Sequence, residues 1–577
     1  MVGMDTAQRL RLYYEACIPM GLLVLGMFHY GFPPFDDTTL TLVPGLLMCI
    51  IITYYLYNRL SSNTDDTHVL LGTQTSMYRR RADPGRMWGG MLVPLVMFAL
   101  NIGDASDEKH SVGLGACGAW VLSVAMAWTF TVRLSGLSSG CSWALCVAGI
   151  LALALAGPWE RGNTGVHVCL VAMSAIAQHM GTQFVVRKLP RSFTLGEAAA
   201  IAQGICLALL DLAAQLFTRK QGLVDPQHMC VLVLEAAGVG TALIVCVLYM
   251  APRHSQGVSV KDTVWMCVAA GAGAGFTTSI IAFVLGANPM RWIVLAVLGS
   301  QTGRIVLIYW FMLMACATAI YAWCAQTPTS SSKLMLHIKR KSYHILAVLL
   351  FAPAYIATPL VLHIGFTIAL CVFVCAESVR VLCLNGWGTQ MTHFMRRFTD
   401  ARDVGLVVTA HFYLLVGCAV PVWLDNTRGC VEAALAGVLA LGVADTCASL
   451  VGLRFGSIKW PATVKTVEGT GAFIASLVVA VECVRWAKGF GYDTAFGYDE
   501  MLGYGLVGSF VVCVAMGVLE ALTDQNDNLV IPLTMYAAVK MLIHSDTISW
   551  VSVVVVAAML AMSLIPHSTL IQLHSVL

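Results

Sequence analysis

One polar stretch late in the chain carries residue types that could bind a phosphorylated ligand. It runs from 442 to 470 and reads GVADTCASLVGLRFGSIKWPATVKTVEGT. If it begins as a helix, steps of three and four place its small and acidic side chains on one face. These residues are Gly442, Asp445, Ser449, Gly452 and Gly456. A carboxylate inside an apolar segment is costly, so Asp445 marks a candidate functional site.

Charged side chains follow on the flank of the same groove. Lys459, Lys465 and Glu468 lie around Pro461, and cations beside a carboxylate and a glycine-lined surface suit a phosphate with its metal ion. The alternative is a seam of small residues where two helices pack, followed by a basic loop whose side chains reach the membrane surface. The residues alone leave both interpretations open.

Two further clusters carry basic residues. The run KRKSYH at 339–344 leads directly into an apolar segment, and Arg340, Lys341 and His344 could face a phosphate or simply anchor a helix at the membrane surface. The run FTDARD at 398–403 precedes a segment that contains His411. The simplest interpretation of this second cluster is a solvated loop followed by a histidine packed in the core, and a catalytic role for His411 is the alternative.

A third cluster is acidic. Glu520, Asp524 and Asp527 follow one another at steps of four and three, which predicts a shared helix face if the helix is continuous. Carboxylates so close together repel one another unless a cation lies between them, so the pattern indicates a metal site. Acidic residues capping a helix end are the alternative.

Composition places these clusters in a membrane protein. Of 577 residues, 58% are hydrophobic and only 11% charged, and the mean hydropathy is +0.77. Apolar runs recur along the whole chain at about the length that a bilayer requires, which predicts an all-α polytopic integral membrane protein with about 15–18 transmembrane helices and no soluble domain. The net charge of +3 resides in loops and does not indicate nucleic-acid binding. No C-x-x-C pair occurs among the 20 cysteines, which we expect to be small buried side chains.

The distribution of basic loops predicts an orientation. If the N-terminus lies inside, the Lys- and Arg-containing loops fall on the inner side, as the positive-inside rule requires; these loops are 58–86, 186–194, 251–262, 325–343 and 384–404. The same count places 453–469 and 520–529 with them. The polar clusters are therefore expected together on the cytosolic side.

Taken together, these strings resemble the dolichol kinase family of CTP-dependent polyprenol kinases. The resemblance rests on RKSYH at 340–344, FTDARD with HFYLLVG within 398–417, the stretch 445–470, and EALTDQNDNLVIPL at 520–533. These strings fall in the last 240 or so residues of the chain. We therefore divide it into a variable N-terminal transmembrane region, 1–325, and a catalytic transmembrane region, 326–577.

The resemblance implies a reaction and its setting. The terminal hydroxyl of dolichol would attack the γ-phosphate of CTP to give dolichyl phosphate and CDP, with Mg²⁺ or another divalent cation. The protein would be a multi-pass protein of the endoplasmic reticulum membrane with its active site facing the cytosol. Its product would be the lipid carrier for N-glycosylation and GPI-anchor synthesis. The preference for CTP over ATP follows from the resemblance only, and no oligomeric state is indicated.

Roles for individual residues complete these expectations. Asp445, Lys465 and Glu468 are the expected catalytic residues, with Asp445 also a candidate general base. The expected metal ligands are Asp445, Asp524 and Asp527. Expected nucleotide contacts are Arg340, Lys341, His344, Gly452, Gly456, Lys459, Lys465, Thr466, Gly469 and Thr470.

Two other functions fit parts of the pattern. A lipid cytidylyltransferase would also combine CTP, Mg²⁺ and a membrane substrate, but it would release pyrophosphate. A secondary transporter would place charges near the middle of the membrane and show similar broken segments in both halves of the chain. The charges here gather at segment ends in one half, which argues against transport.

Overall fold

The computed structural model describes residue 51 and most of the chain between 85 and 543. The described segments are 85–104, 115–134, 139–156, 164–218, 226–250, 260–286, 288–326, 333–383, 385–396, 405–425, 430–460, 463–489, 506–523 and 525–543. Within them the regular structure is helical, apart from one isolated antiparallel bridge between Lys459 and Thr466.

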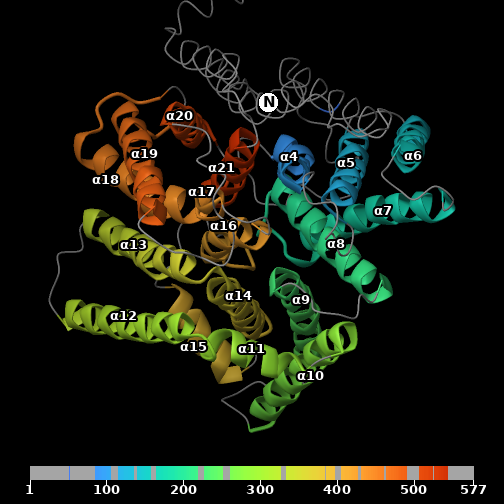
Figure 1. The fold of residues 1–577 in the computed structure, drawn as a ribbon, viewed down its shortest axis with the longest axis horizontal. Coiled ribbons are helices and arrows are strands. Elements are labelled where there is room, and N and C mark those ends of the chain that lie inside the picture. Colours follow the sequence, from blue (N-terminus) through green and yellow to red (C-terminus); the bar gives the residue numbers. More distant parts are fainter. Residues whose placement is uncertain are drawn as a thin grey trace, which may run out of the picture.

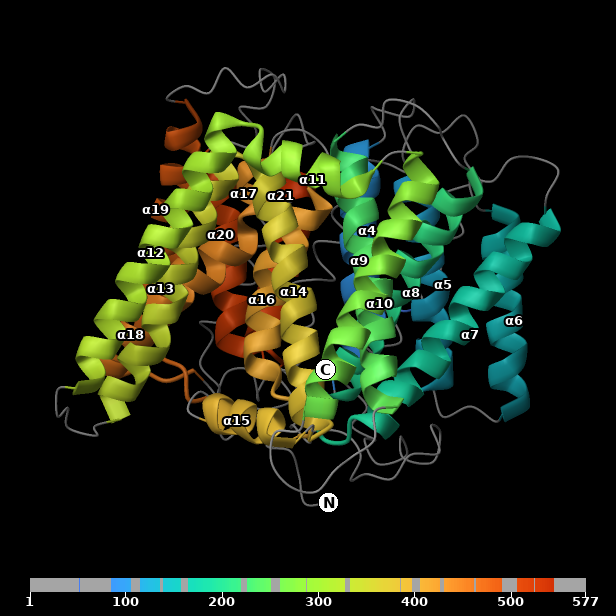
Figure 2. The same cartoon turned by 90° about the horizontal axis from the view of Figure 1, so that it is seen from below.

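The helices follow one another along the chain and form one bundle (Figures 1 and 2). They are α4 (Arg86–Asp104), α5 (Gly115–Arg133), α6 (Ser139–Ala156), α7 (Thr164–Lys188), α8 (Leu195–Thr218), α9 (Pro226–Met250), α10 (Val260–Leu285), α11 (Pro289–Leu298), α12 (Gln301–Gln326), α13 (Lys333–Ala357), α14 (Pro359–Val381), α15 (Asn385–Arg396), α16 (Thr409–Leu424), α17 (Val431–Ala434), η1 (Val438–Ala444), α18 (Asp445–Phe455), α19 (Val467–Gly489), α20 (Leu506–Leu522) and α21 (Asp527–Ile543).

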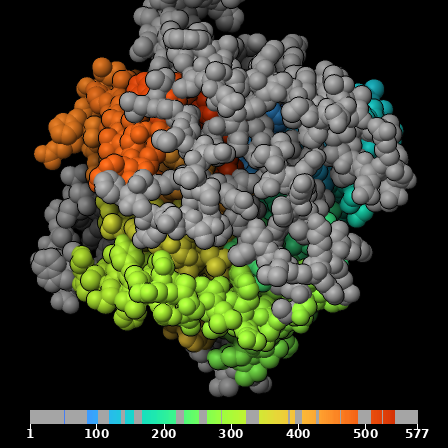
Figure 3. All heavy atoms as spheres, in the orientation of Figure 1, coloured from blue at the N-terminus to red at the C-terminus, as the bar shows by residue number. Residues whose placement is uncertain are grey.

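Length and composition confirm a polytopic membrane protein. Among the described residues, eight helices are long and apolar enough to cross a bilayer, and six shorter helices are apolar as well. Large apolar side chains remain exposed on the outer helices, for example Ile308 and Phe311 of α12. In Figure 3 the green surface of α10–α12 forms one continuous flank of the molecule. Such a surface is expected where lipid tails replace water.

The polar clusters identified in the sequence lie on a few neighbouring helices. α13 packs against η1, α18 against α19, and α19 against α20, while α21 packs against α20, α16 and α4. Figure 1 shows α18–α21 on one side of the bundle, with α4 and α8 beyond α21. Through α4, the N-terminal half of the chain therefore contacts the helix that follows the acidic motif.

A π-helix precedes the motif aspartate. Over η1 the hydrogen bonds lengthen by one residue, so that the N–H of Asp445 donates to the carbonyl of Ala440, five residues earlier. An added Cβ at Gly442 would clash with Val348 of α13, which explains why a glycine lies at this helix contact. Single π turns inside α-helices are frequent at functional sites.

α13 contains a proline that changes its bonding. Pro353 has no N–H to donate to the carbonyl of Leu349, four residues earlier. The hydroxyl of Tyr309 donates to that carbonyl at 2.7 Å, and the indole N–H of Trp310 donates to the carbonyl of Leu350 at 2.8 Å. The hydroxyl of Tyr309 thus replaces the backbone hydrogen bond that Pro353 cannot make, and Trp310 adds a second contact from α12 at the next carbonyl.

Several connections meet at one end of the bundle, which we call the loop end. The N–H of Leu406 donates to the carbonyl of Pro190 at 3.4 Å, and the N–H of Val407 to the hydroxyl of Ser192 at 3.0 Å. The hydroxyl of Thr194 donates to the amide oxygen of Gln525 at 3.3 Å. Figure 2 shows α15 lying across this end. The structure therefore gathers described parts of the predicted inner loops; their cytosolic location stays a prediction.

Candidate active site

Asp445 is paired with the basic motif of α13. The ammonium of Lys341 bonds to Oδ2 of Asp445, and Nδ1 of His344 lies 3.8 Å from the same oxygen. All three side chains are largely buried, each about 15% exposed. Two motifs about 100 residues apart thus meet where η1 ends and α18 begins.

The π-helix also fixes the orientation of His344. Because the N–H of Asp445 bonds to Ala440, the carbonyl of Leu441 is free of its usual bond from Asp445. His344 Nδ1 lies 2.9 Å from this carbonyl. A carbonyl only accepts, so Nδ1 carries the hydrogen, and in the neutral ring Nε2 is left as an acceptor.

Lys465 joins the acidic motif. Its ammonium lies 2.6 Å from Oε1 of Glu520 and 3.7 Å from Oδ2 of Asp527, and it donates to the main-chain carbonyl of Glu520 at 2.5 Å. Burial alone would lower the pKa of Lys465, but the carboxylates of Glu520 and Asp527 outweigh burial and raise the pKa above its ordinary value. The side chain therefore carries its charge at neutral pH.

These two groups of ion pairs form one charged cluster, comprising Lys341, Asp445, Lys465, Glu520 and Asp527. The carboxylate of Asp445 is among the charges that raise the pKa of Lys465. The cluster draws its members from α13, α18, α20, α21 and the loop before α19. The structure thus brings Asp445, Lys341, His344, Lys465 and Asp527 together, whereas their roles in the site stay predictions.

The acidic motif is arranged differently from the predicted continuous helix face. α20 ends at Leu522 and α21 begins at Asp527, so Glu520 and Asp527 lie on two helices joined by a short loop. The N–H of Leu529 donates to the carbonyl of Asn526 at 3.1 Å, in the first turn of α21. The two carboxylates come together because both face Lys465. The predicted catalytic residues and metal ligands do not include Glu520, although its spacing from Asp527 places it in the acidic cluster of the sequence. Asp524 lies outside the described residues.

Glu468 holds the loop that carries Lys465. Its carboxylate accepts from the N–H of Ser457 at 2.9 Å, from the N–H of Ile458 at 3.1 Å, and from the hydroxyl of Ser457. The bridge between Lys459 and Thr466 closes the same loop. Glu468 therefore contacts the start of the loop, whereas Lys465 contacts the acidic motif. Lys459 is exposed.

The predicted glycines lie where α18 and α19 cross. An added Cβ at Gly452 or at Gly469 would lie 3.0 Å from the hydroxyl of Thr466, and one at Gly456 would lie 2.8 Å from it. Glycine is therefore needed here for close approach of protein to protein. This geometry supports the helix-packing interpretation for these three positions, and their contact with a nucleotide stays a prediction.

Thr466 and Thr470 have local partners. The hydroxyl of Thr466 accepts from the N–H of Gly469 at 3.2 Å, and that of Thr470 accepts from the indole of Trp460 at 2.9 Å. Both contacts stabilise the loop and the first turn of α19. The side chain of Arg340 and the run 398–403 are outside the described residues.

The described carboxylates of the cluster do not form a complete metal site by themselves. Within the described segments, no group of three or more His, Cys, Asp or Glu side chains is arranged around a common metal position. Lys341 and Lys465 lie against the carboxylates instead. Mg²⁺ is commonly bound by one or two carboxylates plus substrate phosphates. Asp445 and Asp527 fit that mode.

Comparison with known proteins identifies the family. A family model for dolichol kinase matches residues 182–415. The dolichol kinase of Mus musculus is 26% identical over 480 residues, which are 80% of this chain and 86% of that protein. The dolichol kinase EVAN of Arabidopsis thaliana is 37% identical over 256 residues, 43% of this chain and 42% of that protein.

A fungal relative agrees with them. The dolichol kinase sec59 of Schizosaccharomyces pombe is 31% identical over 270 residues, 45% of this chain and 51% of that protein. No solved structure matches the chain. The range matched by the family model crosses residue 325, so the similarity extends into the predicted variable region, and the division of the chain at that residue stays a prediction. Together with the charged cluster at the loop end of a polytopic membrane protein, these similarities show that the chain belongs to the dolichol kinase family.

Proposed function

We propose that the protein transfers the γ-phosphoryl group of CTP to the terminal hydroxyl of dolichol. One observation carries the proposal: two lysines and three carboxylates from separate helices converge at one end of a membrane bundle. Such a cluster suits a reaction in which positioning and electrostatic stabilisation of phosphate oxygens supply most of the catalysis.

Lysine side chains would neutralise the transferred group. Lys465 is charged and held between Glu520 and Asp527, close to where phosphates and their metal would lie. Lys341 is held by Asp445. An ammonium is a compact charge on a flexible stem, so either lysine can exchange a carboxylate for a phosphate oxygen with a small movement.

Asp445 and Asp527 would hold Mg²⁺ together with the nucleotide phosphates. The bound ion would supply charge neutralisation and orientation of the phosphates. In the described structure the lysines neutralise the carboxylates, so metal and nucleotide would enter together. Asp524 is the third predicted ligand.

His344 is the side chain best placed to take the proton of the lipid hydroxyl. Its Nδ1 is committed to Leu441, so Nε2 can accept a proton while Asp445, 3.8 Å from Nδ1, stabilises the resulting charge. The O–P bond to dolichol forms as the bond between the γ-phosphorus and the bridging oxygen breaks. CDP leaves, and the proton resides on His344. If the metal is held elsewhere, Asp445 is the alternative base.

The setting of the reaction follows from the membrane fold and the family. The lipid chain would remain in the bilayer while its hydroxyl reaches the loop end. The basic loops support placing this end in the cytosol, where CTP and Mg²⁺ are available. We further propose the endoplasmic reticulum membrane as the location, and N-glycosylation and GPI-anchor synthesis as the processes that use the product.

Purified protein with dolichol, Mg²⁺ and γ-labelled CTP tests the proposal. Label should appear in the lipid, with release of CDP and a lower rate for ATP. Pyrophosphate release without lipid label would instead indicate a cytidylyltransferase. In sealed vesicles, a cysteine introduced at the exposed Lys459 should react with a reagent added to the cytosolic side; reaction from the lumen alone would reverse the proposed orientation.

A further inference from the structure

The loop between α18 and α19 exposes large apolar side chains next to the charged cluster. Val464 is 83% exposed, although Lys465, the next residue, contacts Glu520 and Asp527. Four other apolar side chains lie close to it along the chain and are between 37% and 66% exposed. We call these five side chains the apolar rim: Leu453, Phe455, Ile458, Val464 and Val467. Figure 3 shows α18 and α19, in orange, at the edge of the molecule.

The apolar rim continues a lipid-facing surface of α19. At steps of three or four residues this helix exposes side chains that are all apolar or small: Val467, Gly471, Ala475, Val479, Cys483 and Trp486. At 1.5 Å per residue, the stripe from Val467 to Trp486 is about 30 Å long, which is the thickness of the hydrocarbon core of a bilayer. A tryptophan at one end is typical of the boundary between lipid tails and headgroups. The other boundary therefore lies at Val467, where the loop joins α19.

Hydrogen bonds within the loop satisfy its backbone near this boundary. The N–H of Val467 donates to the carbonyl of Ile458 at 2.8 Å, and the N–H of Trp460 donates to the carbonyl of Lys465 at 3.0 Å. The carboxylate of Glu468 accepts from the N–H of Ile458 at 3.1 Å. Backbone groups in contact with lipid need such internal partners, because no water is there to replace them. The loop can therefore contact lipid without losing these hydrogen bonds.

Two basic side chains alternate with the residues of the rim. Arg454 lies between Leu453 and Phe455, and Lys459 follows Ile458; both cationic residues are exposed. The guanidinium of Arg454 lies 5.8 Å from the centre of the Phe455 ring. Apolar side chains accompanied by lysine and arginine are typical of segments that lie in a membrane interface, where the cations meet anionic headgroups. The charge of this loop therefore suits a lipid surface.

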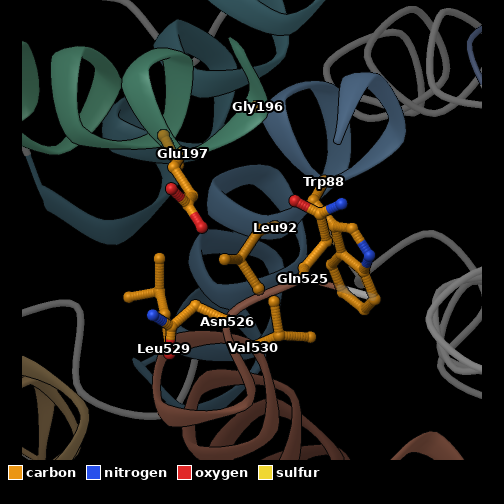
Figure 4. A pocket seen from close by; sticks show the side chains of 9 residues that line it. Trp88, Leu92, Gly196, Glu197, Gln525, Asn526, Leu529 and Val530 are labelled. Carbon is orange, nitrogen blue, oxygen red and sulfur yellow. The ribbon is translucent and has the colours of Figure 1, made fainter. Parts of the chain in front are cut away.

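On its α4 side the acidic motif is closed. Residues of α4, α8 and the start of α21 surround a space that has room for about one water molecule. Figure 4 shows Trp88, Glu197 and Gln525 around this space, which is too small to admit a lipid. Lys465 and Asp527 are nevertheless 24% and 26% exposed, so the charged cluster is accessible from another side. Because the rim adjoins Lys465 in the chain, a lipid hydroxyl can approach the cluster past the rim.

We propose that the apolar rim docks into the bilayer at the loop end, with its side chains among the lipid tails just below the headgroups. Lys465 then lies at the depth where a lipid alcohol presents its hydroxyl. The docking itself is argued from the rim and from α19, whereas its consequence for dolichol rests on the proposed function. Held at this depth, the loop brings the charged cluster to the hydroxyl while the polyprenol chain stays in the membrane.

Photo-crosslinking tests the docking directly. The full-length protein, with p-benzoylphenylalanine in place of Phe455 or Val464, is irradiated in nanodiscs of phosphatidylcholine and phosphatidylserine without nucleotide or dolichol. Lipid adducts should form at both positions, as at the lipid-facing Val479, and much less at Lys459. Adducts at Val479 with none at Phe455 or Val464 would overturn the inference. Crosslinks between two copies of the chain in place of lipid adducts would overturn it as well, because the rim would then be covered by protein.

Kinetics in the same nanodiscs test the consequence for the lipid substrate. The double variant Phe455→Ser with Val464→Ser removes apolar surface from exposed positions and leaves the core intact. Its KM for dolichol should rise about 10-fold, since less apolar area enters the lipid, and its KM for CTP should not change. Val479→Ser, at a position exposed to a similar degree, should leave both constants unchanged. An unchanged KM for dolichol in the double variant would refute the role of the rim in lipid access. Lipid adducts at the rim without any transfer by the wild-type protein would refute the proposed function alone.

Discussion

Replacing Lys465 by methionine separates a structural ion pair from a role in phosphate transfer. The substitution keeps the length of the side chain and removes its charge. Glu520, whose side chain is 9% exposed, then loses the ammonium 2.6 Å away, while Asp527 loses it at 3.7 Å. Removing one partner of a buried pair costs about 3–5 kcal/mol. Because Lys465 itself is 24% exposed, we expect the lower value, about 3 kcal/mol.

The loss of activity should have a different origin. If Lys465 stabilises the developing charge on phosphate oxygens, its removal should lower kcat/KM for CTP by about 10²–10³-fold, as the loss of one such group does elsewhere. The double variant Lys465→Met with Glu520→Gln removes both charges of the pair. It should recover most of the stability, because the buried carboxylate of Glu520 is no longer left unpaired, and little of the activity.

Two assays on the same detergent preparations decide between these roles. Thermal unfolding reports the stability, and transfer of label from γ-labelled CTP to dolichol reports the activity. We expect Tm to recover in the double variant while transfer stays low. Recovery of transfer in step with Tm would show that Lys465 serves only to neutralise Glu520, and it would refute its assignment to phosphate.

Four further outcomes are expected. Asp445→Asn should abolish transfer in a protein that still inserts and remains monodisperse; a wild-type rate would remove Asp445 from the site. His344→Asn, which keeps an amide near the Nδ1 position, should lower kcat by about 10²–10⁴-fold, whereas a rise in KM for CTP alone would indicate a phosphate contact. Glu468→Gln should raise KM for CTP severalfold with a smaller change in kcat, because it weakens the hydrogen bonds that hold the loop carrying Lys465; an unchanged KM would show that this loop does not contact the nucleotide. The pKa of Lys465 is raised, so its ion pair persists below the ordinary lysine pKa of about 10.4 and is lost only as pH rises through the higher, folded-state pKa. The Tm difference between wild type and Lys465→Met should therefore be constant from about pH 7 to about pH 9. A decline of this difference within that interval would contradict the raised pKa.

Most members of the charged cluster could be predicted from the sequence because charged residues are rare in this chain. Among so many apolar residues, Asp445 and Lys465 were conspicuous, and the structure brings them into one cluster with Lys341 and Asp527. Loop charges likewise predicted which connections share one end. Composition and the recurrence of apolar runs predicted the membrane fold without any structural template.

Other features could not be predicted, for identifiable reasons. The π turn before Asp445 depends on packing against α13, and the helical periodicity of the sequence carries no information about this packing. The break between α20 and α21 has no glycine or proline to mark it, so the acidic motif resembled one helix face. Glycines that admit a ligand and glycines that admit another helix look alike in sequence. The contact of α4 with α21 involves a region of the sequence in which only hydropathy was informative.

The proline in α13 has a mechanical consequence. α12 holds α13 at Leu349 and Leu350 through Tyr309 and Trp310, and both positions lie in the part of α13 before Pro353, which also carries Lys341 to Asp445. α12 is the candidate span with the smallest buried share, so its tilt follows the thickness of the surrounding bilayer. A thicker or thinner membrane would therefore shift this part of α13 together with α12 and change the reach of Lys341. The lipid composition around the protein would thereby change the position of Lys341 in the active site without any bound effector.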